Sequence, residues 1–218
     1  MYNLHCHSLL SDGALLPSEL AVRHLHAGYK VIAITDHADY SNIKEVTKAI
    51  LNFTRHWPKN SAITVLPGIE LTHLPPEQFR PLVRYSRKQG IKIIVGHGET
   101  PAEPVAKGIN HAALMAGVDI LAHPGMINDD DIKLAIEKNI FLELTARKGH
   151  CDTNTHVAQA AIKNGANLIL NTDAHAPADI ITPDELKQVG LKAGLSEEQI
   201  REIYKTTEKF LKAKGGIK

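Results

Sequence analysis

The sequence predicts an α/β fold made of repeated strand–helix units within one domain. Short apolar runs alternate with helix-length segments along the 218 residues. Several runs, such as 31–34 and 168–170, are continuously apolar, which is typical of parallel strands covered on both faces. Glycines such as Gly28, Gly90 and Gly165 end helix-length segments just before the next run. Together these observations favour either a doubly wound sheet or a closed barrel.

The expected elements cover residues 1–218 as a single domain of seven strand–helix units and a terminal helix. The apolar runs predict strands at 2–5, 31–35, 63–66, 92–96, 119–122, 140–144 and 167–171. The intervening segments predict helices at 17–27, 42–54, 77–89, 101–115, 129–138, 153–164 and 183–193. A last helix is expected at 196–214, because Ser196 and Gln199 form a capping box before an amphipathic stretch.

Composition excludes several classes of function. The 25 Lys and Arg residues balance 24 Asp and Glu residues, and a net charge of +1 disfavours nucleic acid as a partner. Two cysteines, Cys6 and Cys151, are typical of a reducing compartment. No apolar run approaches the ~18 residues of a membrane span, and no signal peptide is evident, so we expect a cytoplasmic protein without a membrane partner. Composition does not predict an oligomeric state.

Histidine is unusually frequent, with 13 residues against 4 Phe, 1 Trp and 5 Tyr. Six histidines follow expected strands, whose carboxyl ends meet at one rim in parallel α/β folds. Side chains two apart in a strand point the same way, so His5 and His7 converge, as do Asp173 and His175. The other ligand-type residues that follow strands are Asp12, His37, Glu70, His97 and His123.

This donor set predicts a metal cluster. Imidazole and carboxylate without thiolate suit Zn, Mn or Fe. Nine ligands exceed the three or four that one catalytic zinc takes, so we expect two or three divalent ions, two of them bridged by a carboxylate such as Glu70. Six other histidines show no such placement and are expected to be structural or solvated: His24, His26, His56, His73, His111 and His156.

The motifs, taken in order, resemble those of the PHP (polymerase and histidinol phosphatase) family of metal-dependent phosphoesterases. They run from residue 5 to residue 175 and comprise His5-Cys6-His7 with Ser11-Asp12-Gly13, Ile34-Thr35-Asp36-His37, Gly68-Ile69-Glu70, His97, Leu121-Ala122-His123-Pro124-Gly125 and Asn171-Thr172-Asp173-Ala174-His175. The resemblance implies a distorted (β/α)7 TIM-like barrel with a trinuclear site at its carboxyl-terminal rim.

The resemblance also implies how the ligands divide among the ions. One ion would be held by His5, His7, Glu70 and Asp173. Glu70 would bridge to a second ion held by His97 and His123, and a third would be held by Asp12, His37 and His175. Some relatives carry a histidine one place after Asp12, where this chain has Gly13.

Residues on the substrate side follow from the same resemblance. Arg147 and Lys148 stand where relatives carry a basic residue that faces the substrate phosphate, and His150 lies on the same loop. We expect catalytic roles for Arg147, Asp173 and His175. A hydroxide that bridges the ions would attack in line, while Arg147 would bind the non-bridging phosphate oxygens.

The predicted function is therefore hydrolysis of a phosphate monoester, either histidinol phosphate or another small phosphorylated metabolite. The main alternative is a nuclease or nucleotide phosphodiesterase, although no aromatic and basic platform for bases is evident. An amidohydrolase is a further alternative, disfavoured because such enzymes often bridge their metals with a lysine where this chain has His97. A metal-binding domain without catalytic activity is the last.

Overall fold

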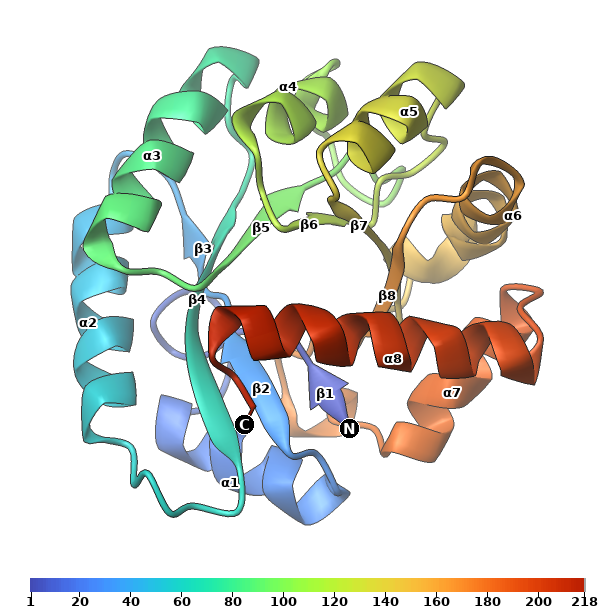
Figure 1. Cartoon of the computed structure of the whole chain (residues 1–218). Coiled ribbons are helices and arrows are strands. Elements are labelled where there is room, and N and C mark those ends of the chain that lie inside the picture. Colours follow the sequence, from blue (N-terminus) through green and yellow to red (C-terminus); the bar gives the residue numbers. More distant parts are fainter. Residues whose placement is uncertain (218) are drawn as a thin grey trace.

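Parallel strands form a nearly closed barrel with helices packed around its outside (Figure 1). The computed structural model describes residues 1–217. Hydrogen-bonded neighbours follow the order β1-β2-β4-β5-β6-β7-β8, and the short β3 pairs with β4 off this path. Every pair is parallel. The predicted distorted barrel of seven main strands is confirmed.

The strands are β1 (Tyr2–Asn3), β2 (Val31–Ile34), β3 (His37–Ala38), β4 (Thr64–Leu71), β5 (Ile93–His97), β6 (Ile120–Ala122), β7 (Phe141–Thr145) and β8 (Leu168–Asn171). The helices are α1 (Pro17–Ala27), α2 (Ile43–His56), α3 (Phe79–Gln89), α4 (Ile109–Ala116), α5 (Asp129–Glu137), α6 (Asn154–Asn164), α7 (Pro183–Lys192) and α8 (Glu197–Lys214). Short 3-10 turns at Pro76–Gln78, His150–Thr153 and Pro177–Asp179 precede α3, α6 and α7.

Backbone contacts between the segments after β1 and β8 join the two ends of the sheet. Cys6 forms an isolated parallel bridge with Ala174. The His7 amide donates to the Ala174 carbonyl at 2.9 Å, and the Asp173 amide donates to the His5 carbonyl at 3.0 Å. The first and last ligand motifs of the chain are therefore held side by side.

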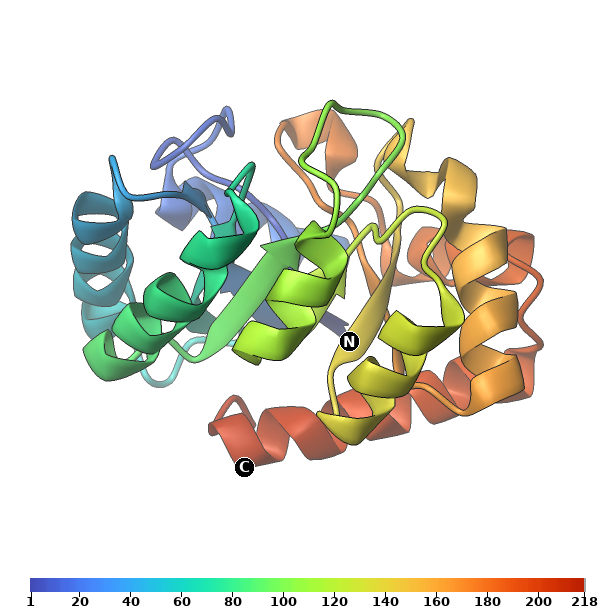
Figure 2. The same cartoon turned by 90° about the horizontal axis from the view of Figure 1, so that it is seen from above.

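The interior of the barrel is apolar and is closed at its amino-terminal end by α8. Inward-facing residues of alternating strand positions, such as Val31, Ile93 and Ile169, form one buried cluster that includes Leu211 of α8. Phe210 packs on Phe141 with ring centroids 5.1 Å apart. Figure 2 shows α8 on one side of the barrel and the loops that follow the strands on the opposite side. Only the carboxyl-terminal end is therefore open for a site.

Two expected elements differ from the structure. The helix predicted at 101–115 is wrong at its start, because α4 begins at Ile109 and 101–108 is a loop. Pro101 and Pro104 lack the amide hydrogens that a helix uses, and Gly108 has a φ of 88°. The strand expected at 63–66 continues to Leu71, so Glu70 lies within β4.

The remaining expected strands and helices lie close to their predicted positions, with ends that shift by a few residues. Within residues 1–217, no helix combines the length and the apolar character that a bilayer crossing requires.

Candidate metal centre

The nine predicted ligands lie at the open end of the barrel. His5 and His7 follow β1 and are fully buried, and the alternation of the extended chain turns Cys6 to the opposite face. There the Cys6 thiol lies 3.3 Å from the Ala33 carbonyl oxygen, within the apolar cluster between the strands and the surrounding helices. The sequence-based interpretation of this motif, two converging imidazoles with a cysteine turned away, agrees with this geometry.

Glu70 lies at the centre of the arrangement and is completely buried. Its Oε2 atom lies 3.2 Å from Nε2 of His5 and 3.4 Å from Nε2 of His7. Its Oε1 atom lies 3.7 Å from Nε2 of His123. Because the two oxygens face different imidazoles, the carboxylate has the placement that a bridge between two ions requires.

Asp173 lies close to the same two imidazoles as Glu70. Its Oδ1 atom lies 3.2 Å from Nε2 of His7 and 3.5 Å from Nε2 of His5. The second group consists of Glu70, His97 and His123, whose ligand atoms lie within 4.8 Å of one another.

A third group contains Asp12, His37 and His175, with His7 beside them. The Oδ2 atom of Asp12 lies 3.4 Å from Nε2 of His175, and its Oδ1 atom lies 3.6 Å from Nε2 of His37. Asp12 is about half exposed, so this group faces solvent more than the other two.

The loop that carries Asp12 is fixed by buried contacts. Asp36 accepts hydrogen bonds from the amide and hydroxyl of Ser8 and from the hydroxyl of Ser11. A Cβ atom at Gly13 would lie 2.4 Å from the His7 carbonyl oxygen, so only glycine fits there. Asp36 thus orients the loop, and a histidine at position 13 would not fit this backbone.

Buried lone pairs without partners show that the site fits divalent cations. Among the described residues, Nε2 of His5, both ring nitrogens of His7, both oxygens of Glu70 and Oδ1 of Asp173 have no hydrogen-bond partner. Buried polar atoms are rarely left in this state. Imidazole nitrogens and carboxylate oxygens gathered at this spacing are the donors that zinc, manganese and iron take.

Backbone strain marks the same place. His123 and Asp173 have positive φ angles of 29° and 52°, although neither is glycine. Such residues cost about 1–3 kcal/mol each and cluster at functional sites. The fold therefore maintains an unfavourable backbone at two of the predicted ligands.

The comparison with protein families agrees with this geometry. The PHP domain model matches residues 3–215. The chain belongs to the PHP family. PHP domains bind metal ions, and the family consists of metal-dependent phosphoesterases.

Relatives of this PHP domain differ in length and in name. An uncharacterized protein of Methanocaldococcus jannaschii is 41% identical over 204 residues, 91% of this chain and 92% of the relative. The DNA polymerase/3'-5' exonuclease PolX of Bacillus subtilis is 30% identical over 79% of this chain, which spans only 34% of PolX. A probable phosphatase of Clostridium novyi is 26% identical over 98% of this chain and 92% of its own length.

Solved structures share the barrel at low sequence identity. A Xaa-Pro dipeptidase has a TM-score of 0.62 and 12% identity over 99% of this chain and 75% of its own. The ochratoxinase of A. niger has a TM-score of 0.56 and 17% identity over 89% of this chain and 67% of its own. At these identities the similarity concerns the fold of the PHP domain alone.

In this PHP domain, hydrogen-bond acceptors beside Nδ1 of His5 and of His97 leave Nε2 of each ring as the nitrogen for a ligand. Nδ1 of His5 lies 2.7 Å from Oε1 of Glu143, and Nδ1 of His97 lies 3.0 Å from the Gly98 carbonyl. An Nδ1–H that donates to such an acceptor leaves the Nε2 lone pair free for a cation. Glu143 also accepts from the side chain of Asn171 and the amide of His123, so it ties three strand ends together.

Burial and neighbouring charges shift the pKa of several groups in the PHP site. Burial lowers the pKa of His5, but Glu143, Asp173 and Glu70 raise it, and the result lies well above the ordinary value. Burial together with the neighbouring imidazoles His37 and His175 holds the pKa of His7 well below its usual value. Burial, with Glu70 and Glu143 nearby, raises the pKa of Asp173 to about 6 against the opposing effect of His5. Bound cations would balance the carboxylate charge that burial otherwise penalises.

The substrate-side residues predicted for the PHP site line a cleft at this rim. Its walls include Arg147, Lys148, His150 and Glu103. Nη1 of Arg147 lies 2.6 Å from Nδ1 of His175, while Lys148 is exposed. His150 is buried, with its ring 4.4 Å from that of His123. Arg147 is therefore the basic residue nearest the predicted ligands.

Three further residues of the PHP site were not assigned from the sequence. Glu143 is the one charged residue of β7, which is otherwise uncharged and buried, and this is a usable signal for a buried functional carboxylate. Glu103 falls in the segment predicted to be a helix, and His73 is among the histidines expected to be structural or solvated. Only the folded loops bring both next to His97.

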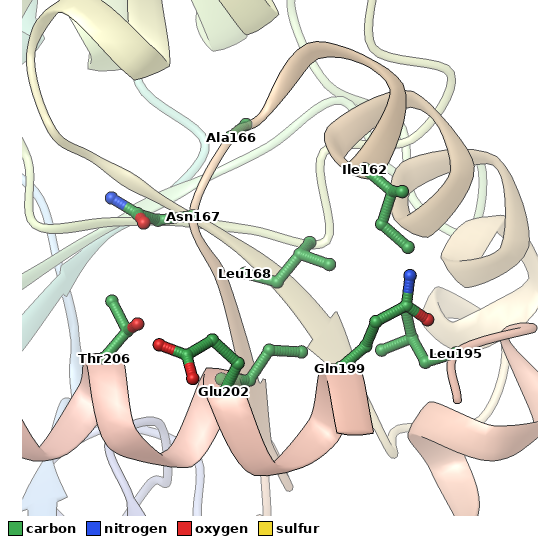
Figure 3. Close-up of a pocket in the computed structure, with 9 residues that line it drawn as sticks. Ile162, Ala166, Asn167, Leu168, Leu195, Gln199, Glu202 and Thr206 are labelled. Carbon is green, nitrogen blue, oxygen red and sulfur yellow. The ribbon is translucent and has the colours of Figure 1, made fainter. Parts of the chain in front are cut away.

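A separate pocket lies away from this rim, between α6, α8 and the start of β8 (Figure 3). Its lining mixes apolar side chains such as Leu168 and Leu195 with Gln199 and Glu202. Asn167, which directly precedes β8, places it toward the amino-terminal end of the barrel, opposite the predicted ligands. No histidine lines this pocket, so the candidate metal centre lies at the carboxyl-terminal rim and not here.

Proposed function

We propose that this protein hydrolyses phosphate monoesters of small metabolites, with histidinol phosphate as one candidate substrate. The observation that carries the proposal is the convergence of nine imidazole and carboxylate side chains beside a cleft that contains Arg147 and Lys148. The similarity to a probable phosphatase over nearly the full length of both chains supports a phosphatase.

The donor set suits two or three ions of Zn²⁺, Mn²⁺ or Fe²⁺. When bound, such ions neutralise the charge of a phosphate ester and supply hydroxide near neutral pH. Glu70 would hold two of them, because its oxygens face different imidazoles. His5, His7 and Asp173 would complete one position, and His97 with His123 the next.

Arg147 would bind the phosphate in this proposal. Its guanidinium lies between His175 and the cleft, and its planar donors match two non-bridging oxygens. Asp173 would hold it from behind, since Nε of Arg147 lies 3.7 Å from Oδ2 of Asp173. Lys148, exposed on the cleft wall, would attract the dianion over a longer range.

The test is a substrate screen on protein of known metal content. Histidinol phosphate, sugar phosphates, nucleotides and p-nitrophenyl phosphate represent monoesters, while bis-p-nitrophenyl phosphate and short oligonucleotides represent diesters. We expect monoester hydrolysis that a chelator abolishes and that added Mn²⁺, Zn²⁺ or Fe²⁺ restores. His5→Ala should remove the activity, whereas Asp131→Asn, which alters a carboxylate–imidazole pair between α5 and α4, should retain it.

Two results would contradict the proposal. A clear preference for diesters or oligonucleotides would instead support the nuclease alternative. Protein that carries its full complement of ions and hydrolyses none of these esters would support a metal-binding domain without catalytic activity.

A further inference from the structure

A second set of metal-ligand side chains lies just outside the central ones. His73, His97 and Glu103 each offer an atom within 4.8 Å of the other two. Oε2 of Glu103 lies 3.2 Å from Nε2 of His97 and 3.2 Å from Nε2 of His73. Ligand atoms on a tetrahedral ion with bonds near 2.05 Å lie about 3.3 Å apart, so this spacing suits a divalent cation.

The three side chains differ in how far they are exposed to solvent. The side chain of His73 is 47% exposed, that of Glu103 is 35% exposed and that of His97 is 2% exposed. His97 also belongs to the inner group with Glu70 and His123. It therefore links the more exposed group with His73 and Glu103 to the buried group with Glu70 and His123.

His97 can serve only one of the two groups at a time. Its Nδ1 lies 3.0 Å from the Gly98 carbonyl, which leaves a single lone pair on Nε2. A cation held by His73, His97 and Glu103 would thus compete with a cation held by His97, His123 and Glu70. Two neighbouring cation positions that cannot be filled together are expected where an ion passes from one to the other. Two ions bound permanently at these positions would each need an imidazole of their own.

The backbone provides independent support for His73. This residue has a φ of 50°, in the left-handed region that costs a non-glycine residue energy. Its side chain is about half exposed, so burial in the core does not account for the strain. The conformation instead keeps the ring over that of His97, with centroids 4.8 Å apart.

Glu103 is held toward the same point by the loop 101–108. The Glu99 carboxylate accepts hydrogen bonds from the amides of Gly108 and Asn110, which anchors the end of this loop. Oε1 of Glu103 lies 3.3 Å from Nε2 of His150, which orients the carboxylate so that Oε2 faces His73 and His97.

We propose that His73 and Glu103, together with His97, form a solvent-facing transit position through which a divalent cation reaches the inner position at Glu70, His97 and His123. The inference rests on the metal cluster of the proposed function. It assigns a role to two residues outside the nine predicted ligands.

The test follows the kinetics of metal loading and needs no substrate. Chelator-stripped protein is mixed with Co²⁺, and the absorbance of the bound ion is recorded by stopped flow. The kinetic phase of the absorbance change that is missing in the His123→Ala variant reports loading of the inner position. Final stoichiometry is measured separately by elemental analysis, and release is followed by mixing loaded protein with excess chelator.

Glu103→Gln and His73→Ala should each slow the identified phase and the corresponding release at least tenfold, with an unchanged final number of ions. Matched controls remove the same groups from exposed positions that contact no predicted ligand. Glu77 lies on the neighbouring 3-10 turn and His56 lies on α2. The Glu77→Gln and His56→Ala variants should therefore bind Co²⁺ at the wild-type rate.

Three outcomes would overturn the inference or its basis. Wild-type rates in both variants would refute the transit position alone. A final count reduced by one ion would show a resident ion at the outer group, which also refutes transit. Wild-type protein that binds no Co²⁺ would instead refute the metal cluster, and with it the proposed function.

Discussion

Nδ1 of His5 lies 2.7 Å from Oε1 of Glu143, and both side chains are fully buried. The pair joins the first ligand motif to β7, 138 residues later in the chain. It fixes the His5 tautomer, and the remaining Glu143 contacts hold the ends of β6 and β8. Glu143 is not one of the predicted metal ligands, but it orients His5, which is one.

Glu143→Gln should weaken metal binding by about 10- to 100-fold, the usual cost of losing a partner that orients a ligand. An amide can still accept from His5 with its oxygen, but its NH₂ group would then face the donating amide of His123. Competition with a coloured chelator measures the affinity. Asp131→Asn breaks a similar carboxylate–imidazole pair with His111, away from the site, and should bind metal like the wild type. Equal affinities in the two variants would contradict the orienting role.

Glu70→Ala should lower the metal content by two ions, whereas His97→Ala should lower it by one. The reason is that Glu70 belongs to two inner ligand groups, while His97 contributes its one lone pair to a single inner group. Elemental analysis after removal of free metal gives the stoichiometry. The loss of equal numbers of ions from both variants would be inconsistent with a bridging carboxylate.

Arg147→Ala should reduce kcat/KM for a phosphate monoester by about 100-fold with an unchanged metal content, as expected for loss of a group that stabilises transition-state charge. Arg147→Lys should recover little of this, because an ammonium group cannot replace two parallel guanidinium donors. Steady-state kinetics checks both variants. Lys148→Ala serves as the control, since this exposed side chain should contribute less than tenfold. A larger effect at Lys148 than at Arg147 would reverse the assignment.

His24 should make stability depend on pH between about 6.5 and 4. Burial lowers its pKa to about 4, and the neutral ring is fixed between the Leu20 carbonyl and the Asn3 amide group. Because the unfolded chain takes up the proton first, the stabilisation is complete above pH 6.5 and is lost progressively toward pH 4, by roughly 3 kcal/mol. Urea unfolding across this range measures it.

The matching variants separate His24 from other titrating groups. His24→Gln should flatten the difference in unfolding free energy between pH 6.5 and 4, whereas the exposed His56→Gln should follow the wild type. Identical pH profiles for His24→Gln and the wild type would assign the dependence to other residues.

Leu211→Ala should destabilise the fold by about 3 kcal/mol, because it leaves a cavity where α8 closes the barrel. The substitution lies at the end opposite the predicted ligands, so metal affinity should not change. Urea unfolding and chelator competition check the two expectations. An unchanged unfolding free energy would show that α8 does not seal the interior.

Much of the site follows from local rules. His5 and His7 are predicted to converge because an extended chain places alternate side chains on one face, and the structure shows both Nε2 atoms near Glu70. Apolar runs at regular intervals predict the parallel strands. These inferences succeed because each depends on a few neighbouring residues.

The site residues that were not predicted are brought into place by contacts between segments far apart in the sequence. Glu103 lies on a loop whose sequence was interpreted as helix, and its neighbours His73 and His150 come from two other loops. Glu143 is visible in the sequence as a polar residue in a buried strand, but its partner His5 is not. No periodicity encodes which loops meet above a barrel.

The sequence by itself determined the repeated strand–helix architecture and the set of ligand-type residues at strand ends, since strand alternation and helix periodicity are local properties. Only the tertiary structure decided that Glu70 faces two groups, that Glu143 holds His5 and that Glu103 reaches His97. Those relationships arise when barrel closure brings β1 beside β8 and packs the loops together, and that closure depends on contacts across the whole chain.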